Sequence, residues 1–241
     1  MSYNRVLLKL SGEALGDNGK GFDFCTIEKV AKQIADLVEN NKTQTGVVIG
    51  AGNIWRGRQG TDMDRVAADH MGMLATIINS LAMKDAIEKC GVKCHVLTSI
   101  EMDSVAEHFN ARRAREILAK NEVCIFAGGT GSPFFSTDTA AALRAAEIDA
   151  DAILLAKNID GVYNADPRKD ENAKRYVSIS FNQVLTDRLQ VMDSSATAMC
   201  MDNDIPVVVF ALNEKDSISR VASGEALGTV VKNDIKTEFY N

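Results

Sequence analysis

The sequence predicts an α/β fold, a three-layer α/β/α sandwich around an open, mostly parallel sheet. Short continuous apolar runs recur along the 241 residues, as is typical of strands that are buried on both faces. Longer segments with apolar residues at three- and four-residue steps, typical of amphipathic helices, separate these runs. No internal repeat, low-complexity tract or long linker interrupts the alternation. We therefore expect residues 1–241 to form a single domain.

The expected strands are the apolar runs themselves. Each is short and rich in Val, Ile, Leu or Ala, and glycine or polar residues follow most of them. In chain order they cover residues 6–10, 45–49, 93–97, 123–127, 152–156 and 207–212.

The expected helices lie between these strands, at residues 26–40, 71–90, 110–120, 137–147, 181–189 and 194–202. In the first, Thr26 is expected to be the N-cap, and one apolar stripe includes Val30, Ile34 and Leu37. The second is apolar over more of its circumference than a one-sided stripe requires, so a second side of it should also be buried. The pattern alone favours burial within the chain, and the alternative is contact with another subunit. Residues 164–174 are polar around Pro167, so they are expected to form a loop.

Composition narrows the class of protein. Hydrophobic residues make up 46% and charged residues 25%, which excludes general disorder. The net charge of −6 argues against a dedicated nucleic-acid or anionic-membrane surface, although a local basic pocket stays possible. No apolar run approaches the roughly 20 residues of a membrane span, and the first residues lack the apolar core of a signal peptide. A cytoplasmic protein is expected.

The five cysteines are scattered, and Cys90, Cys94 and His95 faintly suggest a metal site. No second Cys or His pair at ligand spacing completes it, so buried free thiols are the preferred interpretation and no residue is a firm metal ligand.

Candidate binding segments follow four of the strands. Ligands in open parallel sheets bind beyond the carboxyl ends of the strands, where residues 9–13, 50–57, 128–138 and 157–166 are expected to meet. Glycines there allow backbone N–H groups to approach anionic oxygens, and Lys9 and Arg56 add positive charge. A lysine that closes a buried strand must also meet an anion. One glycine after a strand is usually only a turn, but four such segments at one edge predict a polyphosphate site.

Common phosphate-binding motifs are missing from the sequence. Gly19-Lys20 lacks the upstream glycine and the following hydroxyl of a P-loop. Phe134 stands where a dinucleotide fingerprint needs Gly or Ala, and no protein-kinase signature is present.

Six blocks of sequence together resemble the bacterial UMP kinases of the amino acid kinase superfamily, and the resemblance runs from Arg5 to about Val231. The blocks are KLSGEAL at 9–15, VIGAGN at 48–53, RG at 56–57, DHMGMLAT at 69–76, GGTG at 128–131 with PFF at 133–135, and DGVYNADP at 160–167. The resemblance implies the open α/β/α sandwich of that superfamily. It also implies transfer of the γ-phosphoryl group of Mg-ATP to UMP, giving UDP and ADP, in de novo pyrimidine nucleotide synthesis.

The same resemblance implies a role for individual residues. The catalytic set would be Lys9, Arg56, Asp138 and Asp193, where the two acids orient the lysine and help to place Mg²⁺. ATP would contact Lys9, Leu10, Ser11, Gly12, Gly52, Arg56, Lys157, Asn158, Tyr163 and Asp166. UMP would contact Ala51, Asp69, Thr130, Gly131, Ser132, Pro133, Phe134, Phe135, Ser136 and Thr137.

Plainer interpretations exist for several of these residues. Asp69 and Asp138 could serve only helix starts, and Asp193 could be only an N-cap. Tyr163 could be core, and Asp166 could form a turn before Pro167. Which of Lys157 and Asn158 would meet ATP stays open, and Ala51 replaces a glycine of the family pattern.

The resemblance further implies a homo-hexamer that is activated by GTP and inhibited by UTP. Arg112, Arg113 and Arg115 are candidate anion contacts for GTP, although a solvated helix face is an equally good interpretation. Two other functions compete with UMP kinase activity. One is a related kinase that phosphorylates a carboxylate or carbamate, and the other is a nucleotide sensor without catalysis.

Overall fold

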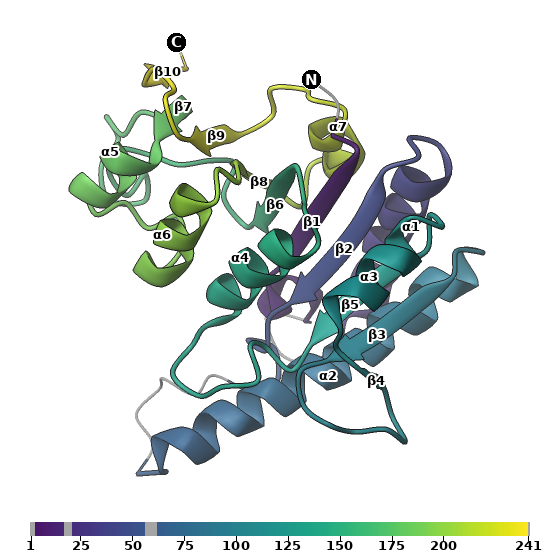
Figure 1. Ribbon diagram of the computed structural model, residues 1–241. Helices are drawn as coiled ribbons and strands as arrows, with labels where there is room; N and C mark the ends of the chain where they lie inside the picture. Colours follow the sequence, from purple (N-terminus) through teal and green to yellow (C-terminus); the bar gives the residue numbers. More distant parts are fainter. Residues whose placement is uncertain (1–2, 17–20, 56–61, 241) are drawn as a thin grey trace.

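The computed structural model describes residues 3–16, 21–55 and 62–240, and its strands form one ten-stranded sheet. Helices lie on both sides of this sheet (Figure 1). The strands are β1 (Arg5–Leu10), β2 (Gln44–Ile49), β3 (Cys94–Thr98), β4 (Glu107–His108), β5 (Val123–Ala127), β6 (Ala152–Lys157), β7 (Tyr176–Ser180), β8 (Val207–Ala211), β9 (Thr229–Lys232) and β10 (Glu238–Phe239). The helices are the 3₁₀ turn η1 (Gly12–Leu15) and α1 (Phe24–Glu39), α2 (Arg65–Lys89), α3 (Ala111–Leu118), α4 (Thr137–Glu147), α5 (Phe181–Thr186), α6 (Ser194–Asp202) and α7 (Ser217–Ala222).

The sheet has the order β10-β7-β9-β8-β6-β1-β2-β5-β3-β4. The run from β8 to β4 is parallel throughout. Strand β9 is antiparallel to β8 and parallel to β7, and β10 is antiparallel to β7. The predicted α/β/α sandwich with a mostly parallel sheet is therefore confirmed, and its parallel part brings the carboxyl ends of β1, β2, β5 and β6 to one edge.

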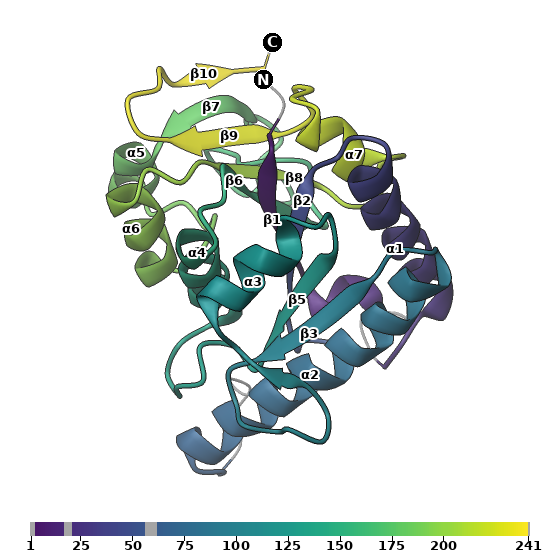
Figure 2. The same ribbon diagram turned by 45° about the vertical axis from the view of Figure 1, so that its right-hand side comes forward.

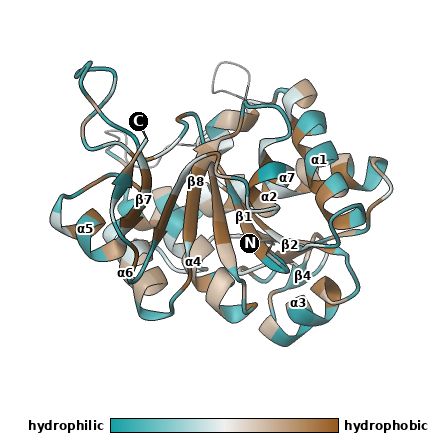
Figure 3. Cartoon of the chain, turned by 90° about the horizontal axis from the view of Figure 1, so that it is seen from above, coloured by the Kyte–Doolittle hydropathy of each residue, from teal (hydrophilic) through white to brown (hydrophobic). Residues whose placement is uncertain are grey.

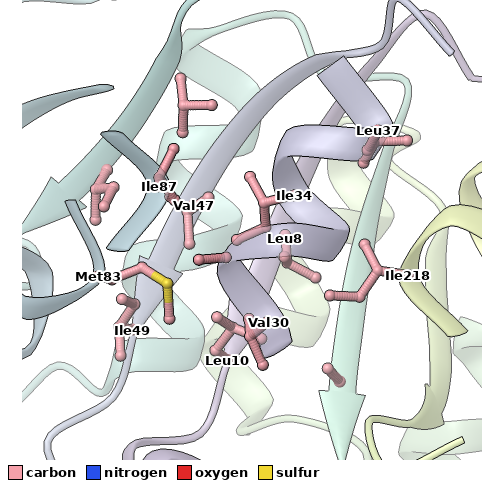
Figure 4. Close-up of a cluster of buried hydrophobic side chains, with 14 of the residues drawn as sticks. Leu8, Leu10, Val30, Ile34, Leu37, Val47, Ile49, Met83, Ile87 and Ile218 are labelled. Carbon is pink, nitrogen blue, oxygen red and sulfur yellow. The ribbon is translucent and has the colours of Figure 1, made fainter. Parts of the chain in front are cut away.

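Two layers of helices cover the sheet (Figures 2 and 3). Because successive strand residues face opposite sides, Leu8 of β1 and Val47 of β2 pack with α1, α2 and α7, as Figure 4 shows. Leu7 and Val48, one residue away on the same strands, belong to the second core beneath α3, α4, α5 and α6. This alternation decides on which side of the sheet each residue at a strand end lies.

Two predicted helix starts were wrong. Helix α1 begins at Phe24, and its N-cap is Asp23 rather than Thr26, because Asp23 Oδ1 accepts from the backbone N–H of Cys25 at 3.0 Å and of Thr26 at 3.2 Å. Helix α2 begins at Arg65 and not at residue 71, because Asp64 caps a first turn whose charged residues conceal the apolar periodicity.

The predicted core of α1 is confirmed. In α2, Met73, Ile77 and Met83 are buried as predicted. Met71, Leu74, Ile78 and Leu81 are 38% to 48% exposed, so the prediction that a second side of this helix is buried within the chain was wrong. Of the described helices, α2 is the one whose length and composition alone would suit a membrane crossing. Several of its residues lie in the main core, among them Ile77, Met83 and Ile87, as expected for a core helix.

The cysteines only partly match the prediction of buried thiols. Cys94, Cys124 and Cys200 are buried, and burial raises the pKa of Cys124 and of Cys200 to about 12. Cys25 and Cys90 are exposed, which corrects the prediction for these two residues. Within the described part of the chain, no cluster of three or more His, Cys, Asp or Glu could hold a metal.

Candidate functional site

Lys9 lies at the end of β1, on the side of the sheet that α4 covers. Its neighbours Leu8 and Leu10 face the opposite core, so the alternation of the strand turns Lys9 toward α4. There Lys9 Nζ lies 2.7 Å from Asp138 Oδ1, and the two side chains are 13% and 22% exposed. The anion that Lys9 meets is therefore the carboxylate of Asp138 at the start of α4. The resemblance implied this contact, since it gave Asp138 the role of orienting the lysine.

Lys157 adds a second amino group to this cluster. In β6, Leu155 is paired with Lys9, so Lys157 faces the same side of the sheet two residues further on. Burial lowers the pKa of Lys157, whereas Asp138 raises it and Lys9 lowers it again. Its Nζ donates to the backbone carbonyls of Val191 and, at 3.3 Å, of Gln190.

Asn158 lies elsewhere. It lines a separate cavity of about 510 Å³ beside α1 and residues 212–216. Of the two residues between which the sequence could not decide, Lys157 belongs with Lys9 and Asp138.

Asp193 joins the starts of α4 and α6. It caps α6 by accepting from the backbone N–H of Ala196 at 2.8 Å, as its plainer interpretation predicts. It also accepts hydrogen bonds from the hydroxyls of Ser136 and, at 3.1 Å, of Thr139. Ser136 is in turn the N-cap of α4. Asp193 thus fixes the helix start that carries Asp138.

The loops after β1 and β2 touch each other through glycines. A Cβ atom at Gly12 would lie 2.7 Å from the backbone nitrogen of Gly52, and closer still to the carbonyl oxygen of Gly50. Leu10 ends β1 fully buried, and Ser11 precedes the 3₁₀ turn that begins at Gly12. Of the glycines in the candidate phosphate loops, Gly12 is the one whose missing side chain most clearly permits the contact.

Asn79 of α2 holds the second of these loops, and sequence reasoning missed it. Its amide donates to the carbonyl oxygen of Gly50 and to Asn53 Oδ1, both at 2.8 Å, while Asn53 Nδ2 donates back to Asn79 Oδ1 at 3.0 Å. The signal in the sequence was a buried Asn on an otherwise apolar helix stripe, which must find polar partners.

A cavity of about 410 Å³ lies between the loop after β2, the first turns of α2 and the loop after β5. The predicted acceptor and loop residues that line it are Ala51, Gly52, Asp69, Thr130, Phe135, Ser136 and Thr137. Glu13, Trp55, Arg65, Met73, Thr76 and Gly129 also line it and were not predicted as site residues. Gly131, Ser132, Pro133 and Phe134 belong to the same loop without being among the lining residues.

Asp69 ties this loop to α2. Its Oδ2 accepts from the backbone N–H of Phe134 and from Arg65 Nε, both at 2.8 Å. Because α2 begins at Arg65, Asp69 lies beyond its first turn, so the alternative role at the helix start does not apply. Phe134 has a φ of 72°, a left-handed conformation that is costly for a residue with a side chain, and the bond to Asp69 helps to hold it.

Tyr163 and Asp166 lie outside this cluster. Tyr163 donates to Asp160 Oδ1 at 2.9 Å, and Asp166 accepts from the backbone N–H of Arg168 at 3.0 Å in a turn, as its plainer interpretation predicts. Within the described ranges, no hydrogen bond or ion pair connects either residue to Lys9 or Asp138. Arg56, the remaining predicted catalytic residue, lies outside the described residues.

The arrangement can hold charged oxygens at two adjoining places. Lys9 and Lys157 concentrate positive charge beside Asp138, and the start of α4 contributes the positive end of its dipole. Ser136 and Thr137 line the cavity, while the next residue, Asp138, contacts Lys9. The N-terminus of α4 therefore separates a cationic cluster from a cavity.

Comparison with known proteins fits this geometry. The family model described as "Amino acid kinase family" matches residues 4–211. The chain belongs to the amino acid kinase family. As a member of this kinase family, it also resembles solved structures over its whole length. It is 37% identical to a UMP kinase from Bacillus anthracis, with a TM-score of 0.96 and 100% of both chains covered.

Two further solved structures are similar to this amino acid kinase. A UMP kinase from Ureaplasma parvum is 40% identical, with a TM-score of 0.90 over 97% of this chain and 100% of that one. A uridylate kinase from Archaeoglobus fulgidus is 26% identical, with a TM-score of 0.71 over 96% and 100% of the two chains. The resemblance that the sequence motifs predicted is confirmed.

Proposed function

We propose that this amino acid kinase transfers the γ-phosphoryl group of Mg-ATP to UMP, giving UDP and ADP. The observation that carries the proposal is the position of α4. Residues 136 and 137 line the 410 Å³ cavity, and Asp138 pairs with Lys9. A donor whose phosphates lie at Lys9 and an acceptor in the cavity would then meet at one helix start. The likeness to UMP kinases at 37% and 40% identity supports this choice of acceptor.

The chain's own residues have a modest chemical task. Phosphoryl transfer requires that the reacting groups are placed in line and that oxygen charge is neutralised. Lys9, held 2.7 Å from Asp138, supplies a fixed ammonium group at the donor phosphates. Asp138 thereby orients Lys9, and Asp193 orients Asp138 through the start of α4. No general base is required, because the accepting phosphate oxygen of UMP is already anionic.

Magnesium fits this site as a companion of ATP. The described residues offer no cage of three or more metal-binding side chains, but Asp138 places one carboxylate at the cationic cluster. Mg²⁺ is commonly held by one or two carboxylates together with substrate phosphates and water, so this donor set suffices. When bound, the ion would neutralise charge on the phosphates of ATP.

The cavity suits a nucleotide better than a small acid. Its volume of about 410 Å³ lies within the range of about 300–1,000 Å³ that is usual for small-molecule sites. Trp55 and Phe135 provide aromatic surface for a base, and Asp69 provides a carboxylate for ribose hydroxyls. A related kinase acting on a carboxylate or carbamate would need a smaller and more polar acceptor site.

We propose further that the protein assembles through α2 into a homo-hexamer. The apolar residues Met71, Leu74, Ile78 and Leu81 follow steps of three and four and form one stripe, and each is between 38% and 48% exposed. The second apolar face that the sequence predicts on this helix is therefore left uncovered within the chain. A stripe of this kind is typical of a helix that packs against another subunit. Light scattering checks the assembly, and a monomer would contradict it.

Regulation by nucleotides is part of the same proposal. UTP shares the uridine of UMP, so it is expected to inhibit in competition with UMP. GTP is expected to activate at a separate site. Arg112 and Arg113 already pair with Glu116 and Glu107 at 3.0 Å, and Arg115 donates to the carbonyl oxygen of Glu147 at 2.6 Å. These pairs favour a solvated helix face over a vacant anion site. The cytoplasmic location and the role in pyrimidine synthesis stay predictions.

Initial rates with different acceptors test the proposed reaction. Purified protein is incubated with Mg-ATP and UMP, CMP, acetylglutamate or aspartate, and nucleotide products are separated by anion-exchange chromatography. UDP and ADP in equal amounts, with much slower release of ADP from the other acceptors, are expected. Preference for acetylglutamate or aspartate would favour the carboxylate kinase instead. Binding of UMP without turnover would favour the nucleotide sensor.

A further inference from the structure

A buried arginine lies behind the loop that lines the acceptor cavity. Arg144 of α4 is 4% exposed, so its charge needs partners inside the protein. Its Nη1 donates to Glu147, and its guanidinium lies 3.6 Å from the centre of the Phe109 ring. Its Nη2 donates to Ser99 Oγ at 2.8 Å, while Nε has no partner in the described part of the chain. Packing alone does not require a guanidinium here, because an apolar side chain of similar size would avoid the unpaired N–H.

Ser99 connects this arginine to the glycine loop. Because Arg144 donates to Ser99 Oγ, the hydroxyl hydrogen of Ser99 is directed to its other partner, the carbonyl oxygen of Gly129, at 2.8 Å. Ser99 also supports the loop by close packing, since a Cβ atom at Gly131 would lie 3.0 Å from the carbonyl oxygen of Ser99. The chain of contacts therefore runs from Arg144 through Ser99 to the peptide that joins Gly129 to Thr130.

That peptide has one face toward Ser99 and one toward the cavity. Every described peptide bond is trans, so the N–H of Thr130 points away from the carbonyl of Gly129 and thus away from Ser99. Gly129 and Thr130 line the cavity and Ser99 does not. Among the described residues, the N–H of Thr130 donates to no protein acceptor. Holding the carbonyl of Gly129 on Ser99 thus keeps one backbone donor available to a ligand in the cavity.

We infer that Arg144 is a positioning residue for the acceptor, which acts through Ser99 to orient the Gly129–Thr130 peptide toward an anionic group of the acceptor. This inference rests on the proposed function, because it takes the cavity to be the acceptor site. Arg144 does not touch the acceptor. It affects acceptor binding only through the conformation of the loop.

Steady-state kinetics of Ser99→Ala, Arg144→Met and the double variant test the inference. Each single substitution breaks the same chain of hydrogen bonds. Loss of one oriented hydrogen bond weakens binding by about tenfold. The KM for UMP should therefore rise about tenfold in each single variant, while the KM for ATP changes less than twofold. The double variant should resemble the single variants, because the two residues act in series. Additive changes in the KM for UMP would contradict the series of hydrogen bonds from Arg144 through Ser99 to Gly129. Equal changes in the KM for UMP and the KM for ATP would contradict it as well.

A control variant and a measurement without substrate complete the test. The control is Glu147→Gln, because Glu147 contacts Arg144 but not Ser99, and a glutamine there can still accept from Arg144 Nη1. The KM of this variant for UMP should stay within twofold of the original. Amide hydrogen exchange of the unliganded protein reports on the loop itself. The N–H of Gly131, which donates to Gly128 O at 3.1 Å, should exchange faster in Ser99→Ala, while strand β5 is unchanged. Unchanged exchange in a folded Ser99→Ala protein would overturn the inference even if UMP proves not to be the substrate. Absence of UMP turnover in the unmodified protein would overturn the proposed function alone.

Discussion

Replacing Lys9 by alanine removes the ammonium group at the centre of the proposed donor site. Lys9 Nζ lies 2.7 Å from Asp138 Oδ1, and both side chains are mostly buried, so the ammonium is held in place before the substrate arrives. Loss of one such preorganised group typically raises the barrier by about 2.7–4 kcal/mol, which is about 10²–10³ in turnover. The fold should persist, because Lys157 still lies close enough to interact with the charge of Asp138.

The assay compares kcat for UDP formation in Lys9→Ala with that of the unmodified protein, after circular dichroism has shown that both are folded. Lys93→Ala is a matched control, because this lysine has a side chain that is 79% exposed and pairs with Glu122. The control should keep its kcat within twofold. A kcat for Lys9→Ala within threefold of the original would refute the assignment of Lys9 to the reacting phosphates.

Three other substitutions and reactions test separate parts of the site. Asp69→Asn should raise the KM for UMP at least tenfold with little change in the KM for ATP, because the carboxylate that lines the cavity and accepts from the Phe134 N–H loses its charge. Equal changes in the two KM values would show a purely structural role. Gly12→Ala should lower the free energy of unfolding, measured in urea, by about 1–3 kcal/mol, because the methyl group of the alanine would meet the backbone of Gly50 and Gly52. Unchanged stability would contradict the close contact between the loops after β1 and β2. Iodoacetamide at pH 8 should modify the exposed thiols of Cys25 and Cys90 in the native protein. It should spare the buried thiols of Cys94, Cys124 and Cys200, because burial raises their pKa values. Rapid labelling of Cys200 would contradict its burial.

The sequence was sufficient for six strands of the parallel part of the sheet, β1, β2, β3, β5, β6 and β8, but not for the short β4 or for β7, β9 and β10, which lie beyond β8. Strands such as β6 are continuous apolar runs, which few other structures explain. Strand β7 alternates apolar residues with Ser178 and Ser180, so its sequence did carry a strand signal, although over five residues only. Strands β9 and β10 are shorter, and their length did not distinguish them from loops. Local pattern cannot predict strands that pair only because a sheet edge is already present.

Prediction of the site had a similar limit. The requirement of a buried lysine for an anion could be inferred from Lys9 alone, but its partner on α4 depends on tertiary packing. The choice between Lys157 and Asn158 depends on where β6 ends, because one residue changes the face of the sheet. Arg144 did leave a signal in the sequence, since it lies within the alanine-rich, buried stretch of α4, where a charge must have internal partners.

A crystal structure with UMP and a non-hydrolysable ATP analogue tests the central claim most directly. UMP is expected to occupy the 410 Å³ cavity, with its uridine between α2 and the loop after β5 and its phosphate beside the N-terminus of α4. The terminal phosphate of the ATP analogue should lie at Lys9, in line with the accepting oxygen of UMP. UMP bound outside this cavity, or an ATP analogue whose phosphates lie away from Lys9 and Gly12, would contradict the proposed function.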